Sequence, residues 1–197
     1  VSEWDGELTL YLQVRIAEES GRSDDIEPEQ FRQELTAGYC DVTVWSNSPG
    51  GDVFSAAQIY TMLKEYGGKV TVKIDGLAAS AASVIAMAGG ETLMSPVSYM
   101  VIHNPATIAI GDSEEMLKTK AMLDEIKEGI INAYEAKTGL DRVEISHLKE
   151  LESCFNARQA VDLGFADGVL YGDKQAEDSS APVMFSRVAA TNSRANK

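Results

Sequence analysis

The sequence predicts a layered α/β fold in which parallel strands are joined by crossover helices. Stretches rich in β-branched and aromatic residues alternate along the chain with stretches of helical periodicity. Strand-like stretches end at turn-forming residues, and residues 47–51 (NSPGG) are the plainest case. The chain has 197 residues, of which 44% are hydrophobic, so it can bury the core of one such domain.

The first part of the chain holds two expected strands and a helix. Residues 8–14 (LTLYLQV) are typical of a strand. Pro28 suits the first turn of a helix that runs to about Leu35, with acidic residues near its positive end. Residues 41–46 (DVTVWS) are β-branched and aromatic, which favours a second strand.

The middle of the chain holds another helix, another strand and a run of small residues. Residues 53–66 have apolar side chains along one face and predict a helix. Residues 70–74 predict a strand that stops at the following Asp-Gly pair. Residues 77–87 are almost all small or apolar, which predicts a helix buried on every side.

Short strands and capped helices follow. We expect strands at residues 92–94 and 98–103. Three helices are expected from their caps: Asp112 or Ser113 begins one that ends at Gly139, Asp141 begins one to about Leu151, and Asn156 begins one to Gly164. We expect a domain over residues 1–171 and a flexible polar tail over residues 172–197, compatible with a linker, a self-cleavage site or an assembly signal.

The charge of the chain excludes some partners. Acidic residues outnumber basic ones by 31 to 17, so the net charge is −14, and neither nucleic acid nor an anionic membrane is an expected partner. No run reaches the roughly 18 apolar residues of a membrane span, and residues 1–5 do not resemble a signal peptide. Cys40 and Cys154 are expected to be buried, and the protein to be cytoplasmic. The chain has no Walker A pattern, so we expect no ATP hydrolysis.

Ser80 has the surroundings of a catalytic nucleophile. It follows a strand-to-turn transition and begins the predicted buried helix, where free N–H groups and the helix dipole favour an oxyanion. The flanking alanines allow a substrate to approach closely. The same composition would also suit a helix that merely packs tightly, and Ser83 is a second candidate one turn later.

His103 is the stronger of two histidine candidates. It ends a predicted strand, and strand ends of α/β sheets gather catalytic groups, although a structural histidine would fit there too. His147 is expected on the solvated side of a helix. The glycines of residues 48–51 would suit an oxyanion-hole N–H, an edge for a peptide, or simply a tight turn.

Taken together, these segments resemble the signature blocks of the Clp protease proteolytic subunit family. The blocks are residues 47–51 (NSPGG), 76–82 (GLAASAA) and 100–105 (MVIHNP), and residues 157–167 (ARQAVDLGFAD) are similar to the family's C-terminal block. The resemblance extends from about residue 8 to residue 171. The residues of these blocks are most similar to those of the phage and prophage branch, whose members are described as head maturation proteases. The resemblance implies a Clp protease/crotonase-like layered βαβ spiral with a protruding long helix.

The resemblance implies a catalytic triad. Ser80 matches the nucleophile and His103 the general base. Glu152 stands where the housekeeping members have an aspartate and the phage branch commonly has glutamate. Asp141 and Glu150 are alternative acids. Glutamate can still accept the imidazole N–H and hold the base in the right tautomer.

The resemblance also implies an oxyanion hole and a substrate edge. Gly51 and Ala81 match the positions whose backbone N–H groups hold the oxyanion. An extended substrate would pair as a strand beside Gly50, Asp52 and Val53. Such a site hydrolyses peptide bonds through an acyl-enzyme and needs no metal or organic cofactor.

The implied assembly is a homo-oligomeric ring, either a heptamer or two stacked heptamers. Residues 114–137 resemble the handle helix through which the family's rings meet. In the plainer interpretation its apolar side chains are core: Met116, Leu117, Leu123, Ile126 and Ile130. Housekeeping members receive unfolded protein substrates from a separate ATPase, whereas phage members act on capsid or scaffold proteins.

Three other functions are weighed against a serine endopeptidase. A crotonase-type enzyme shares the layered fold but acts on acyl-coenzyme A and needs no nucleophilic serine. A signal peptide peptidase would use a Ser–Lys pair and a membrane segment. A catalytically inactive ring-forming or capsid-assembly partner would not need the serine, histidine and acidic residue of a catalytic triad, and all three are present here.

Overall fold

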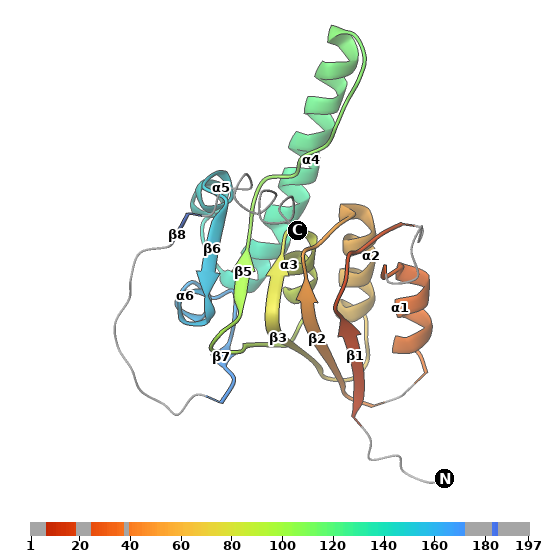
Figure 1. Ribbon diagram of the computed structural model, residues 1–197, viewed down its shortest axis with the longest axis vertical. Coiled ribbons are helices and arrows are strands. Elements are labelled where there is room, and N and C mark those ends of the chain that lie inside the picture. The colour runs from red at the N-terminus through yellow and green to blue at the C-terminus, as the bar shows by residue number, and fades with distance from the viewer. Residues whose placement is uncertain (1–6, 19–24, 38–39, 172–182, 185–197) are drawn as a thin grey trace, which may run out of the picture.

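The computed structural model describes residues 7–18, 25–37, 40–171 and 183–184. Within these residues eight strands form one sheet, in the order β1-β2-β3-β5-β6-β8, with β4 paired to β3 and to β7 (Figure 1). The strands are β1 (Leu8–Leu12), β2 (Val42–Ser48), β3 (Val70–Ala79), β4 (Glu91–Met94), β5 (Tyr99–Val101), β6 (Ser153–Asn156), β7 (Gly168–Val169) and β8 (Val183–Met184). The helices are α1 (Pro28–Leu35), α2 (Val53–Lys64), α3 (Ala81–Ala86), α4 (Ser113–Thr138), α5 (Arg142–Glu150) and α6 (Ala157–Asp162).

The pairing of β1 to β5 is parallel throughout, which confirms the predicted α/β class. The sequence did not indicate β6, which runs antiparallel to β5, or β8, which runs antiparallel to β6. Each of these strands is only two to four residues long, too short for a clear alternation of apolar and polar residues.

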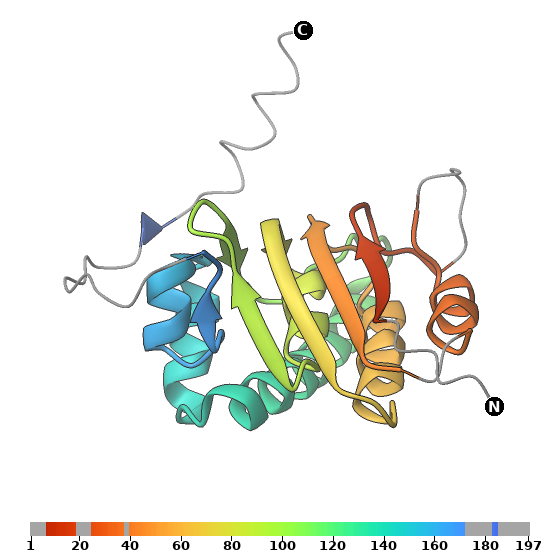
Figure 2. The same cartoon turned by 90° about the horizontal axis from the view of Figure 1, so that it is seen from below.

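The helices cover the sheet and one of them extends far beyond it. Figure 2 shows α2, α3 and α4 on one face of the sheet. All six residues of α3 are buried, as its composition predicted. The first half of α4 projects away from the sheet, beside the segment that leads into it (Figure 1). On α4 only Ile131, Ala133 and Tyr134 are buried, so the interpretation of Met116 and Leu117 as core is wrong.

Strand β3 is longer than predicted, and the buried helix after it is shorter. The strand passes through Asp75 and Gly76 and continues to Ala79, and α3 begins only at Ala81. Its first half pairs with β4 and its second half with β5, so tertiary pairing holds small residues in a strand that local propensity would place in a helix. At this branch a Cβ on Gly76 would lie 2.5 Å from Oδ1 of Asn47, so the side chain of Asn47 would have to shift to accept a larger residue.

The predicted caps of the last three helices are present. The carboxylate of Asp112 accepts from the N–H groups of Glu114 and Glu115, and that of Asp141 accepts from Val143. Asn156 forms a capping box with its helix. Gly139 ends α4 at a φ of 70°, a conformation that glycine adopts without strain.

Other expectations concern the tail, the cysteines and membrane spans. The predicted tail, residues 172–197, lies outside the described residues except for β8, so the domain boundary stays a prediction. Cys40 and Cys154 are unpaired and only half-buried, less buried than expected. Among the described helices, none has the length and apolar character to cross a membrane.

Candidate active site

Ser80 occupies a strained turn between β3 and α3. Its backbone has a φ of 56° and a ψ of −126°, a region that non-glycine residues rarely adopt, at a cost of about 1–3 kcal/mol. Its N–H donates to the carbonyl of Val101 on the neighbouring strand β5, at 2.9 Å. The side chain is half-buried, at the N-terminus of the buried helix α3. This turn therefore presents a hydroxyl where backbone N–H groups are free of helical partners.

Gly50 lies directly against this turn. A Cβ added to Gly50 would stand 2.5 Å from the carbonyl oxygen of Ala79, 2.8 Å from Cβ of Ser80 and 2.9 Å from the backbone nitrogen of Ala81. Its φ of 87° also favours glycine. The Pro-Gly-Gly segment and the serine turn, about thirty residues apart in sequence, are thus in contact because one of the partners has no side chain.

The segment next to Gly50 already uses one of its edges. Ile16 donates its N–H to the carbonyl of Gly50 at 3.0 Å and accepts from the N–H of Asp52 at 2.9 Å. A Cβ added to Gly51 would clash with the carbonyl oxygen of Ile16, so glycine is needed at this position too. Ile16 was not identified from the sequence, and it occupies the carbonyl of Gly50 and the N–H of Asp52 within the predicted substrate edge.

Asp52 and Val53 serve the helix that follows them. The carboxylate of Asp52 accepts from the backbone N–H of Ser55 at 2.7 Å and from its hydroxyl at 2.8 Å, and so caps α2. Val53 is the first residue of α2. Both residues therefore have a structural role at the start of α2, and their contact with a substrate stays a prediction.

His103 follows the end of β5, next to the strand that leads into Ser80. Leu77, Ala78 and Ala79 of β3 are paired with Tyr99, Met100 and Val101 of β5. Ser80 and His103 therefore both leave the carboxyl edge of the sheet from adjacent parallel strands. Nδ1 of His103 lies 2.6 Å from the carbonyl oxygen of Asn104. A carbonyl only accepts, so this contact places the proton on Nδ1 and leaves Nε2 as the basic nitrogen.

Glu152 directly precedes β6, the strand that runs antiparallel to β5. Val101 is paired with Cys154, and the N–H of Ile102 donates to Ser153 at 3.0 Å, so continuing the register sets Glu152 opposite His103. Glu152 has a φ of 48° and, like Ser80, is one of few described non-glycine residues with a positive φ. The register of β6, a strand that the sequence did not predict, is the observation that makes Glu152 a candidate for the third member of the site.

The alternative acids have other partners. The carboxylate of Asp141 caps α5, and that of Glu150 lies 3.2 Å from the ammonium of Lys127. These contacts hold both carboxylates on α5, whereas Glu152 follows the helix and begins the return toward β5.

Similarity to known proteins extends over most of the chain. The family model of Clp protease matches residues 30–173. The ATP-dependent Clp protease proteolytic subunit of Ligilactobacillus salivarius is 33% identical over 145 residues, which cover 68% of this chain and 70% of the relative. Proteolytic subunit 1 of Rhodococcus jostii is 30% identical over 167 residues, covering 83% and 75%, and that of Protochlamydia amoebophila is 27% identical over 171 residues, covering 84% and 82%.

The chain belongs to the Clp protease family. It is therefore a serine-type endopeptidase by family, and the fold and family predicted from the signature blocks are confirmed. The relatives named above are ATP-dependent subunits, so the narrower resemblance to the phage branch stays a prediction.

Ser83, the second nucleophile candidate, has a structural position in this Clp protease fold. Its side chain is fully buried, and its hydroxyl lies 2.5 Å from the carbonyl oxygen of Ser80 and 2.8 Å from the hydroxyl of Tyr134. A buried hydroxyl with both partners inside the protein cannot reach a peptide. The sequence did not indicate Tyr134, because a single tyrosine in a long helix carries no signal of the turn that it contacts.

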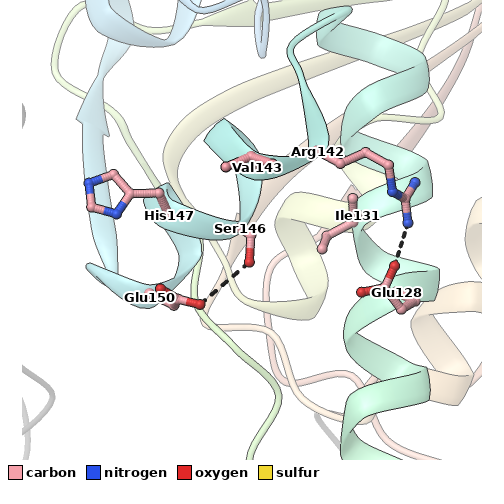
Figure 3. Close-up of a pocket in the computed structure, with 7 residues that line it drawn as sticks. All are labelled: Glu128, Ile131, Arg142, Val143, Ser146, His147 and Glu150. Atoms are coloured by element: carbon pink, nitrogen blue, oxygen red, sulfur yellow. Dashed lines mark hydrogen bonds and ion pairs between the residues drawn. The ribbon is translucent and has the colours of Figure 1, made fainter.

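A hollow of about 410 Å³ lies between α4 and α5, and neither Ser80 nor His103 lines it (Figure 3). It is lined by Glu128, Ile131, Arg142, Val143, Ser146, His147 and Glu150. His147 is exposed there, as predicted. The guanidinium of Arg142 already pairs with Glu128 and Glu135, so the charged groups of this hollow hold α4 against α5.

Proposed function

We propose that this Clp protease family member hydrolyses peptide bonds with Ser80 as nucleophile and His103 as general base. The observation that carries the proposal is the strained turn at Ser80, held between Gly50 and the end of β5 at the start of a buried helix. Backbone strain at a serine that begins a helix is costly, and it is retained where the exposed hydroxyl is used.

The chemistry follows from the atoms that surround this turn. The hydroxyl oxygen of Ser80 bonds to the carbonyl carbon of the substrate while its proton passes to Nε2 of His103. The N–H groups of Gly51 and Ala81 stabilise the oxyanion that forms. The intermediate then collapses, the amine leaves with the proton from His103, and water repeats the sequence to release the acyl group as an acid.

The third member of the triad is proposed to be Glu152. A carboxylate opposite His103 stabilises the imidazolium that forms during acyl transfer. The carbonyl of Asn104 already holds the proton on Nδ1, so in the free enzyme it supports the same tautomer. We propose that the ring turns toward Glu152 when substrate binds, since only a carboxylate offsets the positive charge.

Assembly and partners are proposed from the family and from the exposed surface. Ile108 is 92% exposed, Ile110 is 94% exposed, and Leu117 on the projecting half of α4 is 67% exposed. Such a cluster of apolar side chains is typical of a contact between subunits, so a homo-oligomeric ring, a heptamer or a pair of heptamers, is proposed. A separate ATPase that delivers unfolded protein is the proposed partner, as the relatives' name implies.

A role in phage head maturation is the narrower form of the proposal. This narrower proposal rests on the residues of the signature blocks. In this role the substrates would be capsid or scaffold proteins and not unfolded proteins. Incubation of the purified oligomer with a phage scaffold protein, without an ATPase, separates the two. Cleavage supports head maturation, and an intact scaffold protein beside a cleaved unfolded protein contradicts it. The cytoplasmic location stays a prediction.

The central test is labelling with a fluorophosphonate, followed by peptide mapping. We expect the label on Ser80, and we expect Ser80→Ala to abolish both labelling and peptidase activity while the circular dichroism spectrum and Tm stay unchanged. Ser146→Ala, which changes a serine on α5, is the matched control and should behave like the wild type.

Other outcomes would favour the rival functions. Label on a different serine would overturn the assignment of Ser80. A folded oligomer that takes no label and cleaves no peptide would favour the inactive assembly partner. Tight binding of coenzyme A would favour the crotonase-type enzyme.

A further inference from the structure

The hydroxyl groups of Ser83 and Tyr134 form a short chain that ends on the peptide group of Ser80. Ser83 Oγ lies 2.5 Å from the carbonyl oxygen of Ser80 and 2.8 Å from the hydroxyl oxygen of Tyr134. The carbonyl can only accept, so the single proton of the Ser83 hydroxyl is directed to it. Ser83 Oγ must then accept from Tyr134. The order of donation is Tyr134 to Ser83 to the carbonyl of Ser80.

The peptide group at the end of this chain is the one that carries the proposed oxyanion donor. The carbonyl of Ser80 and the N–H of Ala81 belong to the same peptide bond. That carbonyl also accepts from the N–H of Ser83, at 3.0 Å, so two donors fix the orientation of the peptide plane. A hydrogen bond accepted by a carbonyl polarises its peptide group, and serial hydrogen bonds strengthen one another.

Tyr134 is held rigidly and stays a donor. It is fully buried at the base of α4, and its ring packs edge-on against Phe165, with ring centroids 5.5 Å apart. Phe165 in turn stacks on Phe155. Burial raises the pKa of Tyr134 far above its usual range, against a smaller opposite effect of the hydrogen bond with Ser83, so the phenol keeps its proton.

We propose that Ser83 and Tyr134 are positioning residues that orient and polarise the Ser80–Ala81 peptide, so that the N–H of Ala81 is a stronger oxyanion donor. This inference rests on the proposed function, because it assigns these residues to the same oxyanion hole. It also gives α4 a second role, since the helix that projects from the sheet carries, at its buried end, a side chain that supports the nucleophile turn.

The test compares three variants of the full-length oligomer on a fluorogenic peptide that the wild type cleaves. Tyr134→Phe removes one hydroxyl and keeps the ring against Phe165. We expect kcat to fall about five- to tenfold, the size of one net hydrogen bond, with KM unchanged. Ser83→Ala removes both links of the side-chain relay and should lower kcat further. Tyr66→Phe is the matched control, because its hydroxyl bonds the carbonyl of Cys40 at 2.7 Å, away from the site, and kcat should not change.

Two further measurements separate positioning from general stability. A peptide aldehyde forms an oxyanion with the enzyme, so its inhibition constant should rise by the same factor as kcat/KM falls, while inhibition by the product peptide should not change. Adding Tyr134→Phe to Ser83→Ala should cause no additional loss of kcat. Ser83→Ala by itself already breaks the series of hydrogen bonds between Tyr134 and the carbonyl of Ser80.

The outcomes are distinguishable from failure of the proposed function. If Ser80→Ala remains active, the proposed function fails. If Ser80→Ala is inactive but Tyr134→Phe and Ser83→Ala both match the wild type in kcat and aldehyde inhibition, only the relay is overturned. Independent, additive losses in the double variant, or losses that appear in KM and in product binding, would also contradict it.

Discussion

Ser80 and Glu152 both have a positive φ, which neither residue type favours. Ser80 has a φ of 56° and Glu152 a φ of 48°. Each is fixed by a backbone hydrogen bond, from Ser80 to Val101 at 2.9 Å and from Glu152 to the carbonyl of Lys149 at 3.1 Å. The surrounding structure must offset about 1–3 kcal/mol at each position, so strain is concentrated at the two ends of the proposed triad.

Glu152→Gln tests the proposed acid. We expect kcat to fall about a hundredfold on a fluorogenic peptide. The loss should be smaller than the roughly 10⁴-fold typical of a lost triad carboxylate, because the carbonyl of Asn104 still fixes the tautomer of His103. Glu150→Gln is the matched control, a neighbouring carboxylate that pairs with Lys127. A fall with Glu150→Gln and none with Glu152→Gln would assign the acid to Glu150 instead.

At the scale of elements, the contact between α4 and α5 contains a buried lysine. The side chain of Lys149 is fully buried, and its ammonium donates to the carbonyl of Lys127 at 3.1 Å. Burial, followed by the charge of Lys127, lowers the pKa of Lys149 to about 8. Because the unfolded chain holds this proton up to its ordinary pKa of 10.5, the cost of burying the charge is present in full below pH 8 and is relieved between pH 8 and 10.5.

Lys149→Met should therefore stabilise the protein at neutral pH, by up to about 3 kcal/mol if the shift is fully expressed. Between pH 8 and 10.5 the free energy of unfolding of the wild type should rise relative to that of the variant. The stability advantage of the variant should therefore shrink as Lys149 loses its proton. Thermal unfolding across that pH range measures both effects. Lys64→Met, at an exposed position on α2, is the control and should leave the Tm nearly unchanged. A lower Tm for Lys149→Met at pH 7 would contradict the argument.

At the scale of the whole molecule, the projecting half of α4 and the segment before it carry several apolar side chains that are uncovered within the described chain. Ile108, Ile110 and Leu117 are all more than half exposed. The net charge of −14 favours solubility, and we propose that these exposed apolar side chains contact another subunit.

Leu117→Asp combined with Ile110→Asp should dissociate the oligomer, because a charge in an apolar contact loses hydration without gaining a partner. Sedimentation velocity should show a shift to smaller species. Val97→Asp, at an exposed valine between β4 and β5, is the matched control. A wild type that sediments as a monomer, or a double variant of unchanged mass, would remove the basis for a ring.

The sequence alone determined the features that depend on local chemistry. Caps such as Asp112 and Asn156 placed helix starts correctly, because a side chain that bonds nearby N–H groups acts within a few residues. The motif blocks around Ser80 and His103 indicated the family. Tertiary structure alone decided the extension of β3, the antiparallel pairing of β6 with β5, and the contact of Tyr134 with Ser83. These join residues from about 20 to more than 50 positions apart, and such pairings are set by sheet register and core packing, which local periodicity does not encode.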